Sequence, residues 1–249
     1  MAKDFVTAKI RRQDGARTPG YFQTFRIKKS PFMNIIFILM EIQKNPVDIN
    51  GNKVNPVVWE CSCLEEVCGA CTMLINGVPG QACSALVKDL GDKIVLEPLT
   101  KFPVVRDLAV NRDFMFDNLK KVKAWINVDE TFKLGQGPKF SENLRQFCYK
   151  LSRCMTCGCC LEACPQVNKR NSFMGASTLS QVYLMNSHPN GAFNKAERIN
   201  AILADDGIGN CAKAHNCERV CPKEIPLTEV LGKLNREAVK QYFTNILDK

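Results

Sequence analysis

The stretch Arg153–Pro165, RCMTCGCCLEACP, is the densest group of cysteines in this chain of 249 residues. A second, incomplete copy, CAKAHNCERVCP, runs from Cys211 to Pro222. In the first copy four cysteines follow the spacing C-x2-C-x2-C-x3-C-P, namely Cys154, Cys157, Cys160 and Cys164. Because the second copy repeats this pattern, the two runs are interpreted together.

This spacing is the one with which two-cluster bacterial ferredoxins hold their iron–sulfur clusters, and the fourth cysteine of each run there ligates the other cluster. The pattern therefore predicts one [4Fe-4S] cluster that takes three ligands from the first run and one from the second. Its predicted ligands are Cys154, Cys157, Cys160 and Cys221.

The second run lacks its middle ligand, because Ala214 stands where the template has a cysteine. The other cluster is then left with three thiolates, which suits a [3Fe-4S] cluster; the alternative is a [4Fe-4S] cluster with a fourth ligand other than cysteine. Its predicted ligands are Cys164, Cys211 and Cys217. Cys159 lies off the template and is expected to be a packed thiol.

An earlier motif follows a different spacing, C-x4-C-x2-C with a distal fourth cysteine, which is typical of plant-type [2Fe-2S] ferredoxins. Thr72–Ile75 is expected to be a strand, and Asn76-Gly77 a hairpin turn that returns the chain to the last ligand. Cys61 is a rival for the first position but leaves six residues before the next ligand. The predicted ligands are Cys63, Cys68, Cys71 and Cys83.

Other uses of the chain's 14 cysteines fit less well. A zinc site closes with four ligands and does not require three interleaved patterns. Disulfides are typical of small secreted proteins, whereas this chain is long and opens MAKDFVTAKI without an apolar signal segment. We expect reduced thiols in a cytosolic compartment.

Charge and hydropathy exclude two further classes. The formal net charge is +9, but no nucleic-acid-binding motif accompanies it, so we expect no nucleic-acid partner. The longest apolar run, Ile35–Met40, is far shorter than the ~20 residues that span a bilayer. We expect no transmembrane segment, and any membrane association to depend on a partner.

The first part of the chain predicts a β-grasp fold. Phe5–Ile10 and Tyr21–Lys28 are expected to form a β-hairpin. Asn34 is expected to cap a helix that ends at Lys44 and buries an isoleucine- and leucine-rich stripe. A stripe of Phe114, Leu119, Val122 and Trp125 is expected to form a helical face that joins the domains.

After the GQGP segment Gly135–Pro138, which breaks regular structure, the periodicity predicts helices alone. They are expected over Glu142–Leu151, Leu179–Met185, Lys195–Ala204 and Thr228–Ile246. In the last one Thr228 is the expected cap, and Leu231, Leu234, Ala238 and Phe243 form its apolar side. We expect an α+β protein, with a [2Fe-2S] domain over residues 1–105, a connector over 106–140 and an α-helical two-cluster ferredoxin domain over 141–249.

The order of motifs, CLEEVCGAC with its distal Cys83, then CMTCGCCLEACP, then CAKAHNCERVCPKEIP, resembles the iron–sulfur subunit of succinate dehydrogenase and fumarate reductase. The stretches FPVVRDL, KVKAWI and SHPNGAFNKAERI extend the resemblance over essentially the whole chain. It implies a plant-type and a bacterial-type ferredoxin domain, with [2Fe-2S], [4Fe-4S] and [3Fe-4S] clusters in a line.

The resemblance also implies the partners. A flavoprotein subunit carries FAD and the dicarboxylate site, and a membrane-anchor cytochrome b subunit meets the C-terminal domain near the [3Fe-4S] cluster, where quinone reacts. Electrons would pass from FAD through the three clusters to quinone. This chain would supply no catalytic residue itself and would lie peripherally on the cytoplasmic face of the bacterial inner membrane.

One departure from the family favours a particular branch. Members that reduce ubiquinone commonly have tryptophan shortly after the first Cys-Pro and histidine after the first cysteine of the second run. Here Asn168 and Lys169 follow Pro165, and Ala212 follows Cys211, so quinone contacts at these positions are doubtful. The pattern is more similar to the branch with a dihaem (haem b) anchor and menaquinone.

Two alternatives stay open at the level of sequence. The chain is either a subunit of this oxidoreductase family or the iron–sulfur subunit of another flavoprotein complex, with heterodisulfide or glycolate chemistry. Sequence does not give the direction of the reaction, nor roles for Cys61, Cys148 and His215; a solvated loop is the simpler setting for this histidine.

Overall fold

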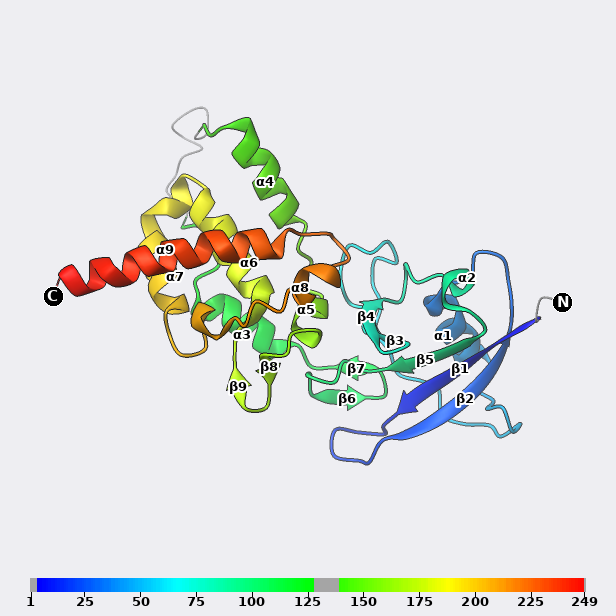
Figure 1. Cartoon of the computed structure of the whole chain (residues 1–249). Helices are drawn as coiled ribbons and strands as arrows, with labels where there is room; N and C mark the ends of the chain where they lie inside the picture. Colours follow the sequence, from blue (N-terminus) through cyan, green and yellow to red (C-terminus); the bar gives the residue numbers. More distant parts are fainter. Residues whose placement is uncertain (1–3, 128–138, 249) are drawn as a thin grey trace. The chain divides into compact units, whose positions relative to one another are not determined.

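The computed structural model describes residues 4–127 and 139–248, which form two compact units (Figure 1). The first unit contains the chain up to Arg112 together with Met155–Glu162, and the second contains Asp113–Cys154 and the chain from Ala163 onward. The division after Arg112 falls inside the predicted connector 106–140. The break expected at Gly135–Pro138 lies outside the described residues.

A five-stranded sheet in the order β2-β1-β5-β3-β4 forms the frame of the first unit. β1 (Phe5–Arg12) pairs with β2 (Tyr21–Lys28) in antiparallel fashion, as predicted, and with β5 (Lys93–Glu97) in parallel. β3 (Thr72–Ile75) joins β5 and β4 (Val78–Gln81), both antiparallel. Thus the strands that flank the predicted [2Fe-2S] ligands lie at the edge opposite β2.

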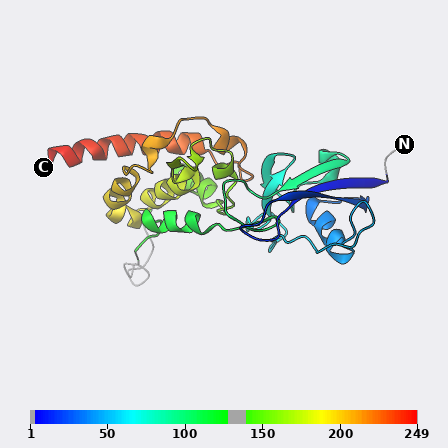
Figure 2. The ribbon, with the colours of Figure 1, turned by 90° about the horizontal axis from the view of Figure 1, so that it is seen from below.

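Helix α1 (Ile35–Lys44) packs on one face of this sheet, as Figure 2 shows. Asn34 caps it as predicted, because its side-chain Oδ1 accepts the backbone N–H of Phe37 at 2.9 Å. All five residues of the expected stripe are buried, and they are Ile35, Ile36, Ile38, Leu39 and Ile42. Together with the inward side chains of the strands they form the core that defines the β-grasp fold.

The predicted turn at Asn76-Gly77 is also confirmed. Both residues have positive φ, 50° and 79°, and connect β3 to β4 in a two-residue hairpin. Shorter elements complete the unit: helix α2 (Val87–Leu90), the hairpin of β6 (Val104–Arg106) and β7 (Ala109–Val110), and helix α5 (Cys159–Glu162). Glu162 accepts the backbone N–H of Lys101 at 3.1 Å, which holds α5 to the chain after β5.

The second unit is a helical domain around α6 (Gly175–Ser187), which is buried on most sides. It packs against α3 (Asp113–Lys121), α4 (Glu142–Ser152), α7 (Lys195–Ile202) and α9 (Leu227–Leu247). The remaining elements are short: the hairpin β8 (Val167–Asn168) and β9 (Asn171–Ser172), the 3-10 turns η2 (Asn190–Asn194) and η3 (Ile208–Asn210), and helix α8 (Asn216–Arg219). All four helices expected after the connector are present, within a few residues of their predicted ends.

Arg198 ties the second unit together through hydrogen bonds to backbone oxygens. It is 1% exposed, and it donates to the backbone oxygens of Lys123 at 2.9 Å, Trp125 at 2.6 Å and Gly191 at 2.7 Å. Burial lowers the pKa of this guanidinium. The segment after α3 is thereby fixed to the turn after α6.

Three details of the expected helices are wrong. Pro226, not Thr228, is the cap of α9, and the Thr228 backbone N–H and hydroxyl both donate to Glu218 in α8. Phe243 is 59% exposed and Trp125 is 47% exposed, so neither joins a buried face. Trp125 lies beyond the end of α3 at Lys121, so the predicted stripe runs past the helix. Phe243 is on α9, where periodicity gives the direction of its side chain but the presence of a packing neighbour depends on tertiary structure.

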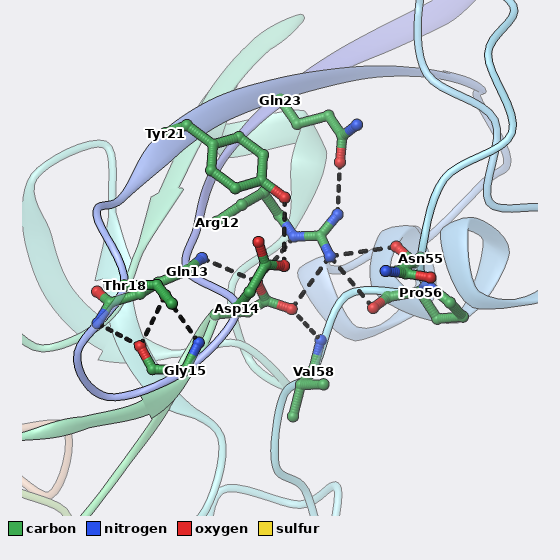
Figure 3. A network of polar contacts seen from close by, with 11 residues as sticks. Arg12, Gln13, Asp14, Gly15, Thr18, Tyr21, Gln23, Asn55, Pro56 and Val58 are labelled. Atoms are coloured by element: carbon green, nitrogen blue, oxygen red, sulfur yellow. Dashed lines mark hydrogen bonds and ion pairs between the residues drawn. The ribbon is translucent and has the colours of Figure 1, made fainter.

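A buried ion pair holds the approach to the first cysteine motif (Figure 3). Arg12 takes an inward position on β1 and is 1% exposed; its Nε donates to Asp107 Oδ1 at 2.9 Å and its Nη2 donates to the backbone oxygen of Asn55 at 3.1 Å. Asp107 also accepts the backbone N–H groups of Gln13 at 3.0 Å and Val58 at 2.9 Å. The network joins β1, the turn between β6 and β7, and the segment that leads to Cys63.

We expect Arg12→Met to lower the free energy of unfolding by about 3–5 kcal/mol, because it leaves the Asp107 carboxylate buried without a cation. Calorimetry or denaturant titration of the purified chain measures this. The control is Lys29→Met, which breaks the half-exposed Lys29–Asp92 pair and should cost less than about 1 kcal/mol. Equal losses in the two variants would contradict the proposed importance of the network.

Candidate cluster sites

The loop that contains Cys63 and Cys68 is wound so that backbone amides face sulfur. Cys63 Sγ accepts the N–H groups of Glu65 at 3.4 Å, Val67 at 3.3 Å and Cys68 at 3.3 Å. Leu64 and Glu66 adopt left-handed backbone conformations, with φ of 62° and 57°, which make this convergence possible. Such strain in residues other than glycine is typical of functional loops.

These amides prepare Cys63 to be a thiolate. The N–H of Glu65, followed by that of Val67, lowers the pKa of the Cys63 thiol to about 7. Cys68 Sγ in turn accepts the N–H groups of Cys63 and Ala70, both at 3.5 Å. Cys61 is exposed and lies before this amide-lined loop, and the choice of Cys63 as the first ligand stays a prediction.

The other two cysteines of the plant-type motif lie at the ends of the β3–β4 hairpin, as predicted. Cys71 is 4% exposed and Cys83 is 7% exposed, and the Ala82 N–H donates to the Cys71 oxygen at 3.2 Å. Burial raises the pKa of the Cys71 thiol to about 12, and the charge of Cys83 adds to the rise. Two buried sulfurs side by side fit a bound iron cluster, whose positive charge makes coordinating thiols lose their protons.

Part of the first bacterial-type run lies in the same unit and contacts this loop. The Gly69 backbone approaches Cys157 so closely that a Cβ built at residue 69 would lie 2.8 Å from Cys157 Cβ and 3.0 Å from the Met155 oxygen. The φ of Gly69 is 73°, in the left-handed region. Backbone of the [2Fe-2S] motif therefore lies directly on a predicted [4Fe-4S] ligand.

The run itself is also tightly wound. Thr156 and Gly158 have positive φ, 51° and 94°, on either side of Cys157. The pKa of the Cys157 thiol is lowered to about 7, mainly because it accepts a hydrogen bond from the Cys159 thiol. Cys159 itself is fully buried in α5, as expected of a packed thiol. Of the predicted [4Fe-4S] ligands, Cys157 and Cys160 belong to the first unit, and Cys154 and Cys221 to the second.

All three predicted [3Fe-4S] ligands line one cavity of about 510 Å³ in the second unit. Burial raises the pKa of the Cys217 thiol to about 11, and the charges of Cys164 and Cys211 add to the rise. Ala214, at the position of the missing cysteine, also lines this cavity. Within the described residues no three His, Cys, Asp or Glu side chains gather around a point that suits a single metal ion; these thiols line a larger space instead.

Local backbone geometry brings the second run to this cavity. Lys213 and His215 have positive φ, 55° and 60°, so the chain between Cys211 and Cys217 is wound like the other cysteine loops. The Asn216 side chain donates to the Ala163 oxygen at 3.1 Å, which fixes the second run beside the residue before Cys164. His215 is exposed and precedes α8, in the loop setting expected for it.

Two polar residues at the first site were not singled out by the sequence. Gln81 is 2% exposed, its Nε2 donates to Thr72 Oγ1 at 2.8 Å, and its Oε1 lies 3.6 Å from Cys71 Sγ. Arg112 reaches the same loop from the end of β7, where its Nη2 donates to the Ala70 oxygen at 3.0 Å. Neither lies within a motif, so no local sequence signal identifies them.

A β-grasp unit with an amide-lined cysteine loop, joined in the chain to a helical unit with a thiol-lined cavity, defines a multi-cluster iron–sulfur protein. Family comparison agrees: residues 7–117 match the 2Fe-2S iron-sulfur cluster binding domain, and residues 150–225 match the 4Fe-4S dicluster domain. The protein is therefore one that carries both plant-type and bacterial-type clusters.

Relatives specify the family. The succinate dehydrogenase iron-sulfur subunit of Bacillus subtilis is 52% identical over 95% of this chain and 93% of its own length. The fumarate reductase iron-sulfur subunit of Wolinella succinogenes is 31% identical over 94% of this chain and 97% of its own. The chain belongs to the family of iron–sulfur subunits of succinate dehydrogenase and fumarate reductase.

Solved structures agree on the fold. A chain of the Mycobacterium smegmatis Sdh1 complex in the apo form superposes with a TM-score of 0.82, at 18% identity, over 97% of this chain and 98% of that one. The α+β fold class expected from the sequence is thus confirmed. In the part of the chain that the structure describes, no helix is both long and apolar enough to cross a membrane.

We expect Gly69→Ala to reduce the [2Fe-2S] content per chain severalfold, because the new methyl group overlaps Cys157 and the Met155 oxygen. Electron paramagnetic resonance (EPR) of the dithionite-reduced protein, with iron analysis, measures the loss. Gly77→Ala is the control: it carries the same left-handed penalty of about 1–2 kcal/mol but has open space around its Cβ. If both variants keep their cluster equally, the close approach has no role in cluster binding.

Proposed function

We propose that this chain relays electrons between the flavin of a flavoprotein subunit and quinone at a membrane anchor, as the iron–sulfur subunit of a succinate dehydrogenase or quinol:fumarate reductase complex. Family membership makes it a subunit of a membrane-associated oxidoreductase complex. Iron–sulfur clusters supply one-electron transfer. The protein residues hold the clusters, shield them and set their potentials, while the dicarboxylate chemistry takes place on the flavoprotein.

We assign the ligands as the spacing predicts them. Cys63, Cys68, Cys71 and Cys83 would hold the [2Fe-2S] cluster, and Cys154, Cys157, Cys160 and Cys221 the [4Fe-4S] cluster. Cys164, Cys211 and Cys217 would hold the [3Fe-4S] cluster. The [3Fe-4S] assignment is supported by one observation. Its three thiols line a single cavity together with Ala214, which occupies the position where the template has a fourth cysteine.

The finer points of the proposal rest on the family resemblance. The absence of tryptophan after Pro165 and of histidine after Cys211 favours menaquinone and a dihaem cytochrome b anchor. A position on the cytoplasmic face of the bacterial membrane follows from the same analogy. The cavity of Cys164, Cys211 and Cys217 is the natural end of the relay, because quinone would react near that cluster.

Low-temperature EPR of the purified complex tests the relay. We expect a [3Fe-4S] signal in the oxidised state and a [2Fe-2S] signal after reduction, with succinate as an effective reductant. Clusters that dithionite reduces but succinate does not would point to another flavoprotein complex. A preparation without iron signals that contains zinc would overturn the proposal altogether.

We expect Ala214→Cys to supply the missing fourth thiolate and to convert the [3Fe-4S] cluster to a [4Fe-4S] cluster. The oxidised-state EPR signal should then decrease by most of its intensity, and iron per chain should rise by about one atom, the difference between the two cluster types. Ala212→Cys is the matched control, because it adds a thiol to the same cavity wall but not at the position that the C-x2-C-x2-C spacing requires. An unchanged signal in a folded Ala214→Cys protein would refute the alignment of the second run.

A further inference from the structure

Arg112 places a guanidinium against the [2Fe-2S] loop. Its side chain is only 14% exposed, and its Nη2 donates to the backbone oxygens of Ala70 at 3.0 Å and Thr72 at 3.5 Å. These two residues flank Cys71, one of the cysteines assigned to the cluster. The planar group is therefore held beside a cluster ligand by two backbone acceptors, which fix its position better than a single contact would.

The same guanidinium lies near the first bacterial-type run. Gly69, directly before Ala70, contacts Cys157, which is assigned to the [4Fe-4S] cluster. The guanidinium donates to the Ala70 oxygen at 3.0 Å, so it lies one residue along the chain from that contact. One cation thus lies close to cysteines that are assigned to two different clusters, and these contacts are all within the first unit.

Arg112 and Arg12 differ in how exposed their acidic partners are. Arg12 is paired at 2.9 Å with the fully buried Asp107. Arg112 pairs with Glu60 at 3.9 Å, and this carboxylate is 51% exposed, so solvent screens the pair. Arg112 Nε is buried and has no hydrogen-bond acceptor within the described residues. A buried N–H without an acceptor costs about 1–3 kcal/mol, and a bound group with acceptor atoms would remove this cost.

We propose that Arg112 is an electrostatic tuning residue that raises the reduction potentials of the [2Fe-2S] and [4Fe-4S] clusters. Reduction adds one negative charge to a cluster, and a fixed cation in a site of low dielectric constant stabilises that charge. Because one guanidinium lies near both sites, it raises both potentials together and changes the difference between them less than it changes either one. The inference rests on the ligand assignments of the proposed function.

The test is an EPR-monitored redox titration of the purified complex with four variants. Arg112→Gln and Arg112→Met remove the charge, the first with a polar side chain and the second with an apolar one. Arg112→Lys keeps the charge without the planar fork. Arg26→Gln removes a positive charge from the same unit at a distant place. Arg26 is on β2, at the sheet edge opposite β4, and lies over the ring of Phe5 on β1.

In the neutral variants we expect the reduction equilibrium of each of the two clusters to shift about tenfold towards the oxidised form, which is 59 mV for one electron. Arg112→Lys keeps the charge, so its two potentials should stay close to those of the unsubstituted complex. Arg26→Gln should shift either potential by less than a third of the change expected in the neutral Arg112 variants. The [3Fe-4S] signal, whose assigned ligands all lie in the second unit, reports that the complex is intact.

Unchanged potentials in both neutral variants would overturn the inference, as would an equal shift in Arg26→Gln, which would indicate a general effect of net charge. Loss of the clusters from both neutral variants but not from Arg112→Lys would also overturn it, in favour of a role in assembly. Failure of the proposed function is distinct, because the unsubstituted complex would then lack the cluster signals themselves.

Discussion

The structure depends on one constraint: many cysteine sulfurs lie close together, and each becomes negatively charged when it binds iron. The fold accommodates these charges in two ways. At the exposed loop, backbone amides surround Cys63 and lower its pKa to about 7. At buried positions, Cys71 and Cys217 have raised pKa values of about 12 and 11, so only bound iron makes the thiolate favourable. Cluster binding at these buried sulfurs therefore has to release protons.

Left-handed backbone residues are the local device that all three cysteine loops share. Leu64 and Glu66, then Thr156, then Lys213 and His215 have positive φ, although none is glycine. This conformation turns successive N–H groups inward, which forms a concave site that suits an anionic group. The strain falls on short loops supported by rigid elements, by the β3–β4 hairpin in the first unit and by α6 and α9 in the second.

Three arginines with little exposed side chain have different roles according to what surrounds them. Arg12 is paired with Asp107 and holds the approach to the first loop, so its role is structural. Arg198 donates to backbone oxygens and fixes a turn of the helical unit. Arg112 lies beside an assigned cluster ligand, and the carboxylate of its partner Glu60 is 3.9 Å away and 51% exposed. The same residue type therefore supplies stability in two places and an electrostatic field in the third.

The sequence by itself determined the α+β fold class, the two kinds of cluster domain and most elements, because these depend on local signals. Asn34 as a cap, the stripe on α1 and the Asn76-Gly77 turn act over a few residues, and the cysteine spacing is set by how a short loop surrounds a cluster.

Tertiary structure alone decided which residues lie against those loops. Gly69 meets Cys157, and Arg112 meets Ala70, across dozens of residues of chain. It also decided that Arg12 is buried, that Thr228 binds Glu218 and that Phe243 stays exposed. Periodicity gives the direction of a side chain, whereas burial depends on whether another part of the chain packs there.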